Sequence, residues 1–178
     1  MTIVITQPFF FEGEAERICQ LLQRGDVDLI HIRKPDSSYE DMDRLIASLP
    51  DRLHRRLVVH DHFQLAQKYS LRGLHLNRRH PLPPPGWQGQ LSISCHSIAE
   101  LEACRRKPYD YMSLSPIFDS ISKQGYRAGF SEEVLSDARL RGIIDRRVMA
   151  LGGVTFGKVS EVQRMGFGGA MILGDAWR

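Results

Sequence analysis

The stretch Val148-Met149-Ala150-Leu151-Gly152-Gly153 is apolar over four residues and then ends in two glycines. A short run that is apolar throughout is typical of a parallel strand covered on both faces, whereas a strand with one wet face alternates. Seven other short β-rich runs occur along the chain, and several of them are also apolar throughout. They span residues 3–6, 28–32, 57–60, 73–76, 91–94, 111–114 and 170–173. The sequence therefore predicts eight strands.

Amphipathic segments separate most of these runs, and their apolar spacing predicts helices. Ser37 and Ser38 precede one that extends to Pro50, and either hydroxyl suits an N-cap. Ser97 and Glu100 form a capping-box pattern at the start of another. The helix that Ser97 precedes spans residues 98–106, and the remaining predicted helices span residues 14–24, 63–69, 132–141 and 158–165.

Eight strands that alternate with helices favour an α/β fold, an eight-stranded parallel βα barrel (TIM barrel), formed by residues 1–178 as one domain. The chain is short for this fold, for which roughly 250 residues are typical. The proline-rich residues 79–86 leave no room for a helix after the fourth strand, and only residues 174–178 follow the eighth. We therefore expect the last helix to be reduced or absent. An open doubly wound sheet is the alternative, and the strand number argues against it.

The composition excludes several classes of protein. The net charge is +3 and the basic residues are scattered, so nucleic acid is not an expected partner, whereas phosphorylated small molecules are. No run reaches the roughly 18 apolar residues of a membrane span, and the N-terminus lacks a signal-peptide pattern. The three cysteines lack metal-ligand spacing and indicate reduced thiols in a cytoplasmic protein. Nothing in the sequence predicts the oligomeric state.

Catalytic groups in βα barrels lie where the strands end, so the strand ends are the candidate sites. After the second strand, His31 and Arg33 share one side and Lys34 stands at the mouth, a group that suits a phosphate. Pairing of Arg33 with a neighbouring helix is the alternative. After the third strand, Asp61 suits either Mg²⁺ binding or capping of the next helix. His60, Asp61 and His62 cannot all face inward from an extended strand, which argues against a zinc site.

The fifth and sixth strands end in hydroxyl groups and an imidazole. Ser94 and His96 can face a cavity together as donors to a ligand, although a buried His96 bonded to backbone is an alternative. Cys95 between them is interpreted as a buried structural thiol. Beyond the sixth strand, Ser120, Ser122 and Lys123 suit a mobile clamp on an anion. An ordinary polar loop is the alternative.

Glycines end the seventh and eighth strands. Gly152 and Gly153 follow the seventh, and Gly174 follows the eighth. Barrels commonly bind phosphate through backbone N–H groups of these two loops, and glycine allows the close approach. We therefore expect a phosphate cradle there.

Taken in order, these strand ends resemble the thiamin phosphate synthase and thiazole tautomerase family from the second strand to the end of the chain. The resemblance lies in segments at corresponding strands: His31-Ile32-Arg33, His60-Asp61 with Leu65-Ala66, residues 73–76, residues 94–97, Asp110-Tyr111 with residues 115–118 through Lys123, and Gly152-Gly153-Val154.

The synthases of this family join a hydroxymethylpyrimidine pyrophosphate to a thiazole phosphate with the help of Mg²⁺. The resemblance implies that Arg33 and Lys123 hold the pyrophosphate and that Ser94, Ser120 and Ser122 donate hydrogen bonds to it. It also implies that Gly153 and Gly174 hold the thiazole phosphate. His60, His96, Lys34 and Gly152 complete the expected substrate-binding set, with His31 as a further catalytic candidate and Asp61 as the Mg²⁺ ligand.

Some positions depart from the synthase pattern. His31 replaces a usual Gln, Pro35 a usual Lys, and His60 a usual Asn. The second Mg²⁺ carboxylate is missing from residues 77–80, where Arg78 and Arg79 offer positive charge instead. These features are similar to the metal-independent tautomerases, in which His31, His60 or His96 would be the acid-base group. The tautomerases, however, carry a His where Pro116 stands. The synthase reaction is therefore expected first, then the tautomerase, then a catalytically silent barrel that binds thiamin intermediates.

Overall fold

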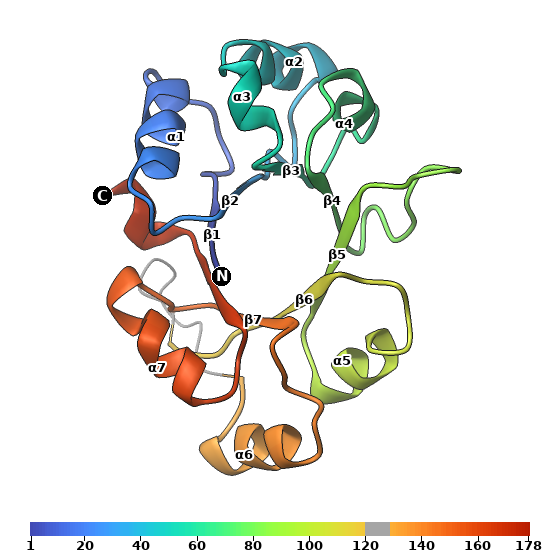
Figure 1. The fold of residues 1–178 in the computed structure, drawn as a ribbon, viewed down its shortest axis with the longest axis vertical. Coiled ribbons are helices and arrows are strands. Elements are labelled where there is room, and N and C mark those ends of the chain that lie inside the picture. Colours follow the sequence, from blue (N-terminus) through green and yellow to red (C-terminus); the bar gives the residue numbers. More distant parts are fainter. Residues whose placement is uncertain (120–128) are drawn as a thin grey trace. The chain divides into compact units, whose positions relative to one another are not determined.

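The computed structural model describes residues 1–119 and 129–178. Its eight parallel strands hydrogen-bond in chain order and close into a barrel, which confirms the predicted fold (Figure 1). The strands are β1 (Thr2–Ile5), β2 (Leu29–Ile32), β3 (Leu57–Val59), β4 (Gly73–Leu76), β5 (Gln90–Cys95), β6 (Tyr111–Leu114), β7 (Val148–Leu151) and β8 (Gly169–Ile172).

The helices follow the predicted alternation. They are α1 (Glu14–Gln23), α2 (Tyr39–Ala47), α3 (Asp51–His54), α4 (Gln64–Lys68), α5 (Ile98–Cys104), α6 (Glu132–Leu140) and α7 (Val159–Arg164). No helix stands between β4 and β5, and only a 3₁₀ turn, η2 (Gly174–Trp177), follows β8. The missing helix after β4 and the reduced last helix were both predicted. The helix predicted to extend to Pro50 instead ends at Ala47, and the short α3, which the sequence analysis missed, begins after Pro50.

Serine side chains cap three helices and explain where they begin. Ser38 accepts a hydrogen bond from the backbone N–H of Asp41 at 3.0 Å, and Ser97 accepts one from Glu100 at 3.1 Å. Ser131 does the same at the start of α6. The Glu100 carboxylate accepts from the backbone N–H of His96 at 2.7 Å, one residue before the position that a capping box prescribes. Hydroxyl caps satisfy N–H groups that the first helical turn leaves unpaired.

The chain forms two compact units, Ile3–Leu91 and Met1–Thr2 with Ser92–Arg178. In the first unit, β2 pairs with β1 and β3, and its Ile30 and Ile32 are fully buried. Helices α1 and α2 contribute Ile18, Leu21 and Met42 to the buried set. The interpretation of residues 1–178 as one domain stays a prediction.

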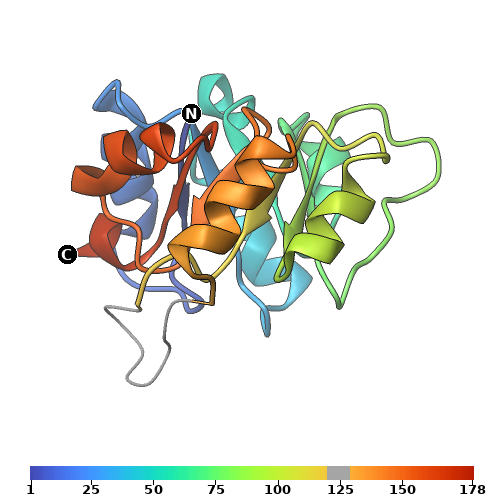
Figure 2. The same ribbon diagram turned by 90° about the horizontal axis from the view of Figure 1, so that it is seen from below.

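In the second unit, β6 pairs with β5 and β7, and β7 pairs with β8. Helices α5, α6 and α7 lie outside these strands (Figures 1 and 2). Met1 pairs along β8: its amino group donates to the Gly168 carbonyl at 3.0 Å, and its carbonyl accepts from Ala170 at 3.0 Å. In the described part of the chain, every helix is too short or too polar to cross a membrane.

Candidate active site

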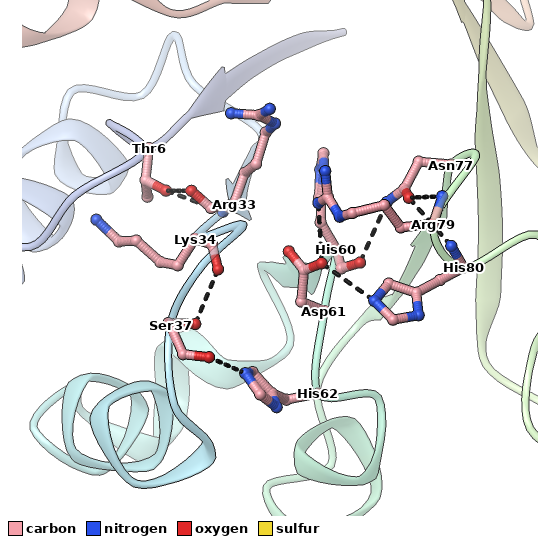
Figure 3. A network of polar contacts seen from close by, with 10 residues as sticks. All are labelled: Thr6, Arg33, Lys34, Ser37, His60, Asp61, His62, Asn77, Arg79 and His80. Carbon is pink, nitrogen blue, oxygen red and sulfur yellow. Dashed lines mark hydrogen bonds and ion pairs between the residues drawn. The ribbon is translucent and has the colours of Figure 1, made fainter.

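Asp61 lies directly after β3 at the centre of a polar corner in the first unit (Figure 3). Its Oδ1 accepts a hydrogen bond from Arg79 Nη2 at 2.9 Å and lies 3.2 Å from His80 Nε2. Asp61 is only 4% exposed, and its Oδ2 is buried without a hydrogen-bond partner among the described residues. The alternative that Asp61 caps the next helix is wrong, because no side chain caps α4.

Asn77 shapes the turn after β4 that presents two of these partners. Its side-chain oxygen accepts hydrogen bonds from the backbone N–H groups of Arg79 and His80 at 2.9 and 3.2 Å. Its amide nitrogen donates to the His60 carbonyl at 3.3 Å, which ties the turn to the end of β3. Asparagine commonly folds the chain in this way, through bonds to backbone two residues on. The turn thereby directs Arg79 and His80 to Asp61 (Figure 3).

Arg33 is half-buried at the end of β2. Its backbone N–H donates to Thr6 Oγ1 at 2.9 Å, whereas its guanidinium has no hydrogen bond or ion pair among residues 1–119 and 129–178. The alternative pairing of Arg33 with a neighbouring helix is therefore not seen in the described residues. Burial and then the nearby Arg79 lower the pKa of Arg33, and Asp61 and Asp36 partly offset them. A guanidinium nevertheless stays charged in proteins, so a half-buried cation is available for an anion here.

Lys34 is fully buried, and its position differs from the expected one. Its ammonium donates to the carbonyls of Gln7 and Phe9 at 3.0 and 2.6 Å and to Glu14 Oε1 at 2.6 Å. Burial lowers the pKa of Lys34, and the bond to Glu14 opposes that shift. An ammonium has three donors, and all three are used inside the protein. Lys34 thus fixes the segment between β1 and α1 and has no donor left for a ligand.

His31, His60 and His75 form a buried cluster with one imidazole from or beside each of β2, β3 and β4. His31 Nδ1 lies 2.9 Å from His60 Nε2, and the rings of His60 and His75 stack with centroids 4.3 Å apart. Burial lowers the pKa of His31 and His60 well below the usual value and that of His75 to about 3. All three imidazoles are therefore neutral near pH 7. His75 was not among the site residues predicted from the sequence; the recurrence of His at or near the ends of three successive strands was the available signal.

The histidine cluster is a poor metal site despite the proximity of its nitrogens, which lie within 4.8 Å of one another. The rings of His60 and His75 are only 27° from parallel. Their lone pairs therefore lie in two stacked, nearly parallel planes, which disfavours convergence on one tetrahedrally coordinated ion. Two guanidiniums, Arg33 and Arg79, also act on His60 electrostatically and disfavour a cation. We interpret the cluster as a neutral, hydrogen-bonded layer beneath the corner.

In the second unit, His96 and Ser115 follow β5 and β6. His96 Nδ1 lies 3.2 Å from Ser115 Oγ, and His96 is exposed, so the alternative of a buried His96 is wrong. Ser94 is half-buried within β5. Cys95 is fully buried and forms no disulfide, as expected for a structural thiol. An exposed imidazole beside a hydroxyl can bind a polar ligand.

Gly152 and Gly153 both have positive φ angles, 92° and 63°, in the turn after β7. A Cβ on Gly153 would lie 2.3 Å from the Asp119 carbonyl oxygen, and one on Gly152 would lie 2.8 Å from Pro116 Cα. The segment after β6 packs on this turn, with the Phe118 N–H donating to the Gly152 carbonyl at 3.0 Å. Close backbone packing therefore requires these glycines whether or not a phosphate binds.

Gly174 begins η2, directly after Leu173. The next residue, Asp175, accepts a hydrogen bond from the Phe156 N–H at 3.0 Å, which connects the segments after β7 and β8. This hydrogen bond thus joins the two predicted phosphate-binding loops of this unit in the absence of a ligand. Ser120, Ser122 and Lys123 lie outside the described residues, so the anion clamp stays a prediction.

The donor set of the corner does not fit a protein-held Mg²⁺ site. Mg²⁺ takes octahedral oxygen ligands, commonly one or two carboxylates with waters and substrate phosphates. Arg79 and His80 occupy Asp61 Oδ1, and Oδ2, which has no partner among the described residues, is buried. The segment after β4 adds no carboxylate. The side-chain oxygen of Asn77 already accepts two backbone hydrogen bonds, and the other side chains there are the guanidiniums of Arg78 and Arg79 and the imidazole of His80.

Comparison with known proteins identifies the family. A thiamine-phosphate synthase of Proteus mirabilis is 29% identical over 172 residues, which cover 89% of this chain and 76% of the relative. The crystal structure of a thiamine phosphate pyrophosphorylase from Bacteroides thetaiotaomicron matches with a TM-score of 0.87 and 40% identity over 99% of this chain and 84% of that one. One from Pyrococcus furiosus, 21% identical with a TM-score of 0.75 over 98% and 89% of the two chains, shares the fold. The family model described as thiamine monophosphate synthase matches residues 2–174, and the chain belongs to that family.

Proposed function

We propose that this protein is a thiamin phosphate synthase, a transferase that joins the hydroxymethylpyrimidine group of its pyrophosphate ester to the nitrogen of thiazole phosphate. Membership of the thiamine monophosphate synthase family over residues 2–174 carries this proposal. In the reaction, the C–O bond to pyrophosphate breaks and a C–N bond to the thiazole forms. The products are thiamin phosphate and pyrophosphate, and both substrates are phosphorylated small molecules.

Arg33 is the proposed pyrophosphate ligand in the first unit. Its guanidinium is half-buried and unpaired among the described residues, which supports a role in binding a multiply charged anion. The resemblance adds Lys123, Ser120 and Ser122 as further pyrophosphate ligands. Lys34 is left out of the proposed set because its three donors are used within the protein. His31 and His60 are left out as direct ligands because they are buried beneath the corner.

The second unit contains the other candidate ligands that the resemblance implies. Ser94 and the exposed His96 offer a hydroxyl and an imidazole to a substrate. Backbone N–H groups at Gly153 and Gly174, next to Gly152, are the proposed ligands of the thiazole phosphate. The family resemblance carries this assignment, because packing against Asp119 already accounts for a glycine at position 153.

The tautomerase alternative is less well supported by the structure. It needs an acid-base group in contact with the substrate, and His31 and His60 are buried and neutral. After β6, residues 115–119 carry no imidazole, and Pro116 stands where the tautomerases of the family have one. Of the three histidines considered for that role, His96 is the exposed one. We therefore propose the synthase activity, with the cytoplasm as its location.

Purified protein incubated with both synthase substrates provides the test. The expected result is thiamin phosphate, detected by oxidation to fluorescent thiochrome after chromatography. Arg33→Gln should lower the rate strongly, whereas Arg52→Gln removes the same charge at an exposed position before β3 and should not. A parallel incubation with the thiazole carboxylate phosphate tests the tautomerase. Absence of thiamin phosphate from folded protein, with or without Mg²⁺, would rule out the synthase, and absence of both products would indicate a silent binder.

A further inference from the structure

The corner around Asp61 is richer in cations than a metal site should be. Arg33 and Arg79 each carry a positive charge. Asp61 accepts a hydrogen bond from Arg79, and Asp36 is a second carboxylate that acts on Arg33 electrostatically. His80 adds a third basic group, 3.2 Å from the same carboxylate. Positively charged side chains repel a divalent cation and attract anions, so Arg33 and Arg79 favour an anionic ligand. The segment after β4 supplies the cations at the place where the family resemblance implies a metal-binding carboxylate.

Arg79 is held in place by two independent sets of contacts. Asn77 accepts the backbone N–H of Arg79 at 2.9 Å, and Asp61 accepts its Nη2 at 2.9 Å. The Arg79 side chain nevertheless remains 44% exposed, so its guanidinium has a face open to a ligand. A guanidinium has five N–H donors in a planar fork, and one bond to Asp61 leaves enough of them for bidentate contact with phosphate oxygens. The arrangement orients a cation while keeping it available (Figure 3).

We propose that Arg79 takes the place of the metal ion in this protein, so that Arg79 and Arg33 together bind the substrate pyrophosphate directly. This inference rests on the proposed synthase function. When the C–O bond breaks, both bonding electrons leave with the pyrophosphate oxygen, and the guanidiniums stabilise the added negative charge. The lone pair of the thiazole nitrogen then forms the new bond to carbon. In this arrangement Asp61 is a positioning residue for Arg79 and not a metal ligand.

Calorimetric titration with potassium pyrophosphate in EDTA tests the binding step without turnover. The wild type should bind pyrophosphate in EDTA, so the binding should not require Mg²⁺. Arg79→Gln should raise the Kd about tenfold or more, which is the usual effect of losing a charged hydrogen bond. Arg79→Lys should retain part of the affinity, and Arg52→Gln, the matched exposed control, should behave like the wild type. Binding that appears only with Mg²⁺, or an unchanged Kd in Arg79→Gln, would overturn the proposal.

Asp61→Asn distinguishes a positioning carboxylate from a metal ligand. If Asp61 orients Arg79, the variant should lose pyrophosphate affinity equally in EDTA and in Mg²⁺. The double variant Asp61→Asn/Arg79→Gln should then be no weaker than Arg79→Gln alone, because the two residues act as one unit. A loss seen only in Mg²⁺ would identify Asp61 as a metal ligand and contradict the inference.

Turnover separates this inference from the proposed function. Thiamin phosphate synthesis that persists in EDTA supports both the synthase function and the role of Arg79. Arg79→Glu returns a carboxylate to the segment after β4, and any synthesis that remains in this variant should depend on Mg²⁺. Synthesis that EDTA abolishes in the wild type would leave the function standing and overturn the role of Arg79. Metal-free pyrophosphate binding without any synthesis would instead refute the function while leaving the anion site in place.

Discussion

Lys34 and Glu14 show at the scale of single residues how a charge can be committed to structure instead of to function. Their side chains are 0% and 2% exposed and lie 2.6 Å apart. Burial raises the pKa of Glu14, and Lys34 opposes that shift, while Glu14 Oε2 has no partner among the described residues. A charge removed from water is costly unless it is paired. Each of these residues therefore depends on the other.

Lys34→Met should strongly destabilise the protein, because it leaves Glu14 buried without its cation. Breaking a buried pair in this way costs about 3–5 kcal/mol. Urea unfolding followed by circular dichroism measures the change. Adding Glu14→Gln to Lys34→Met should restore part of the stability, since no buried charge is then left unpaired. A small loss in Lys34→Met, or a double variant that is less stable than either single variant, would contradict the buried ion pair.

At the scale of elements, strands β2, β3 and β4 bring three neutral histidines together. Burial lowers the pKa of His31, His60 and His75, and that of His75 falls from 6.5 to about 3. Below pH 6.5 the unfolded chain therefore binds protons that the folded chain does not. The stabilising effect is complete above pH 6.5 and is lost as the pH falls, by about 1.4 kcal/mol per pH unit for each imidazole kept neutral.

His75→Gln should make stability less sensitive to acid. In the wild type, the free energy of unfolding should fall steeply from pH 6.5 towards pH 4, and the slope of that fall counts the protons taken up on unfolding. In the variant, the slope should correspond to about one fewer proton taken up on unfolding. Gln67→Ala, at an exposed position in α4, removes no ionisable group; it is the control and should leave the slope unchanged. Equal slopes in wild type and His75→Gln would show that His75 is protonated in the folded state.

Local sequence patterns predicted most elements because the determining residues are close in the chain. The bounds of β4, β6 and β7 match the predicted runs, and Ser38 and Ser97 mark the starts of α2 and α5. The helix α3 was missed because four residues are too few for an amphipathic period to be visible.

Side-chain roles were harder to predict than elements, since they depend on partners far along the chain. The position of Arg33 at a strand end suggested an anion ligand, and its guanidinium is indeed unpaired among the described residues. Lys34, one residue later, instead reaches back to the carbonyls of Gln7 and Phe9. The bond between Asp61 and Arg79 likewise spans 18 residues and depends on the turn that Asn77 forms.

At the scale of the whole molecule, the first residue completes the hydrogen bonding of the last strand. The Met1 amino group donates to the Gly168 carbonyl, and the Met1 carbonyl accepts from the Ala170 N–H, although Met1 and Gly168 are 167 positions apart in the sequence. Gly169 lies between these two positions, and a Cβ there would be 1.8 Å from the Met1 carbonyl oxygen. That distance is impossible for real atoms, and the obstacle is backbone, which cannot rotate away.

Gly169→Val should therefore separate Met1 from β8 and destabilise the fold. The backbone shift that overpacking forces typically costs 1–3 kcal/mol, or about 2 kcal/mol here. Thermal unfolding should show a clearly lower Tm, and amide exchange should become faster at Ala170, whose N–H loses its acceptor. Gly157→Ala is the matched control, because its Cβ would meet its first neighbour, Thr155 Oγ1, at an ordinary 3.8 Å. A Tm in Gly169→Val as high as that of Gly157→Ala would mean that Met1 does not lie along β8.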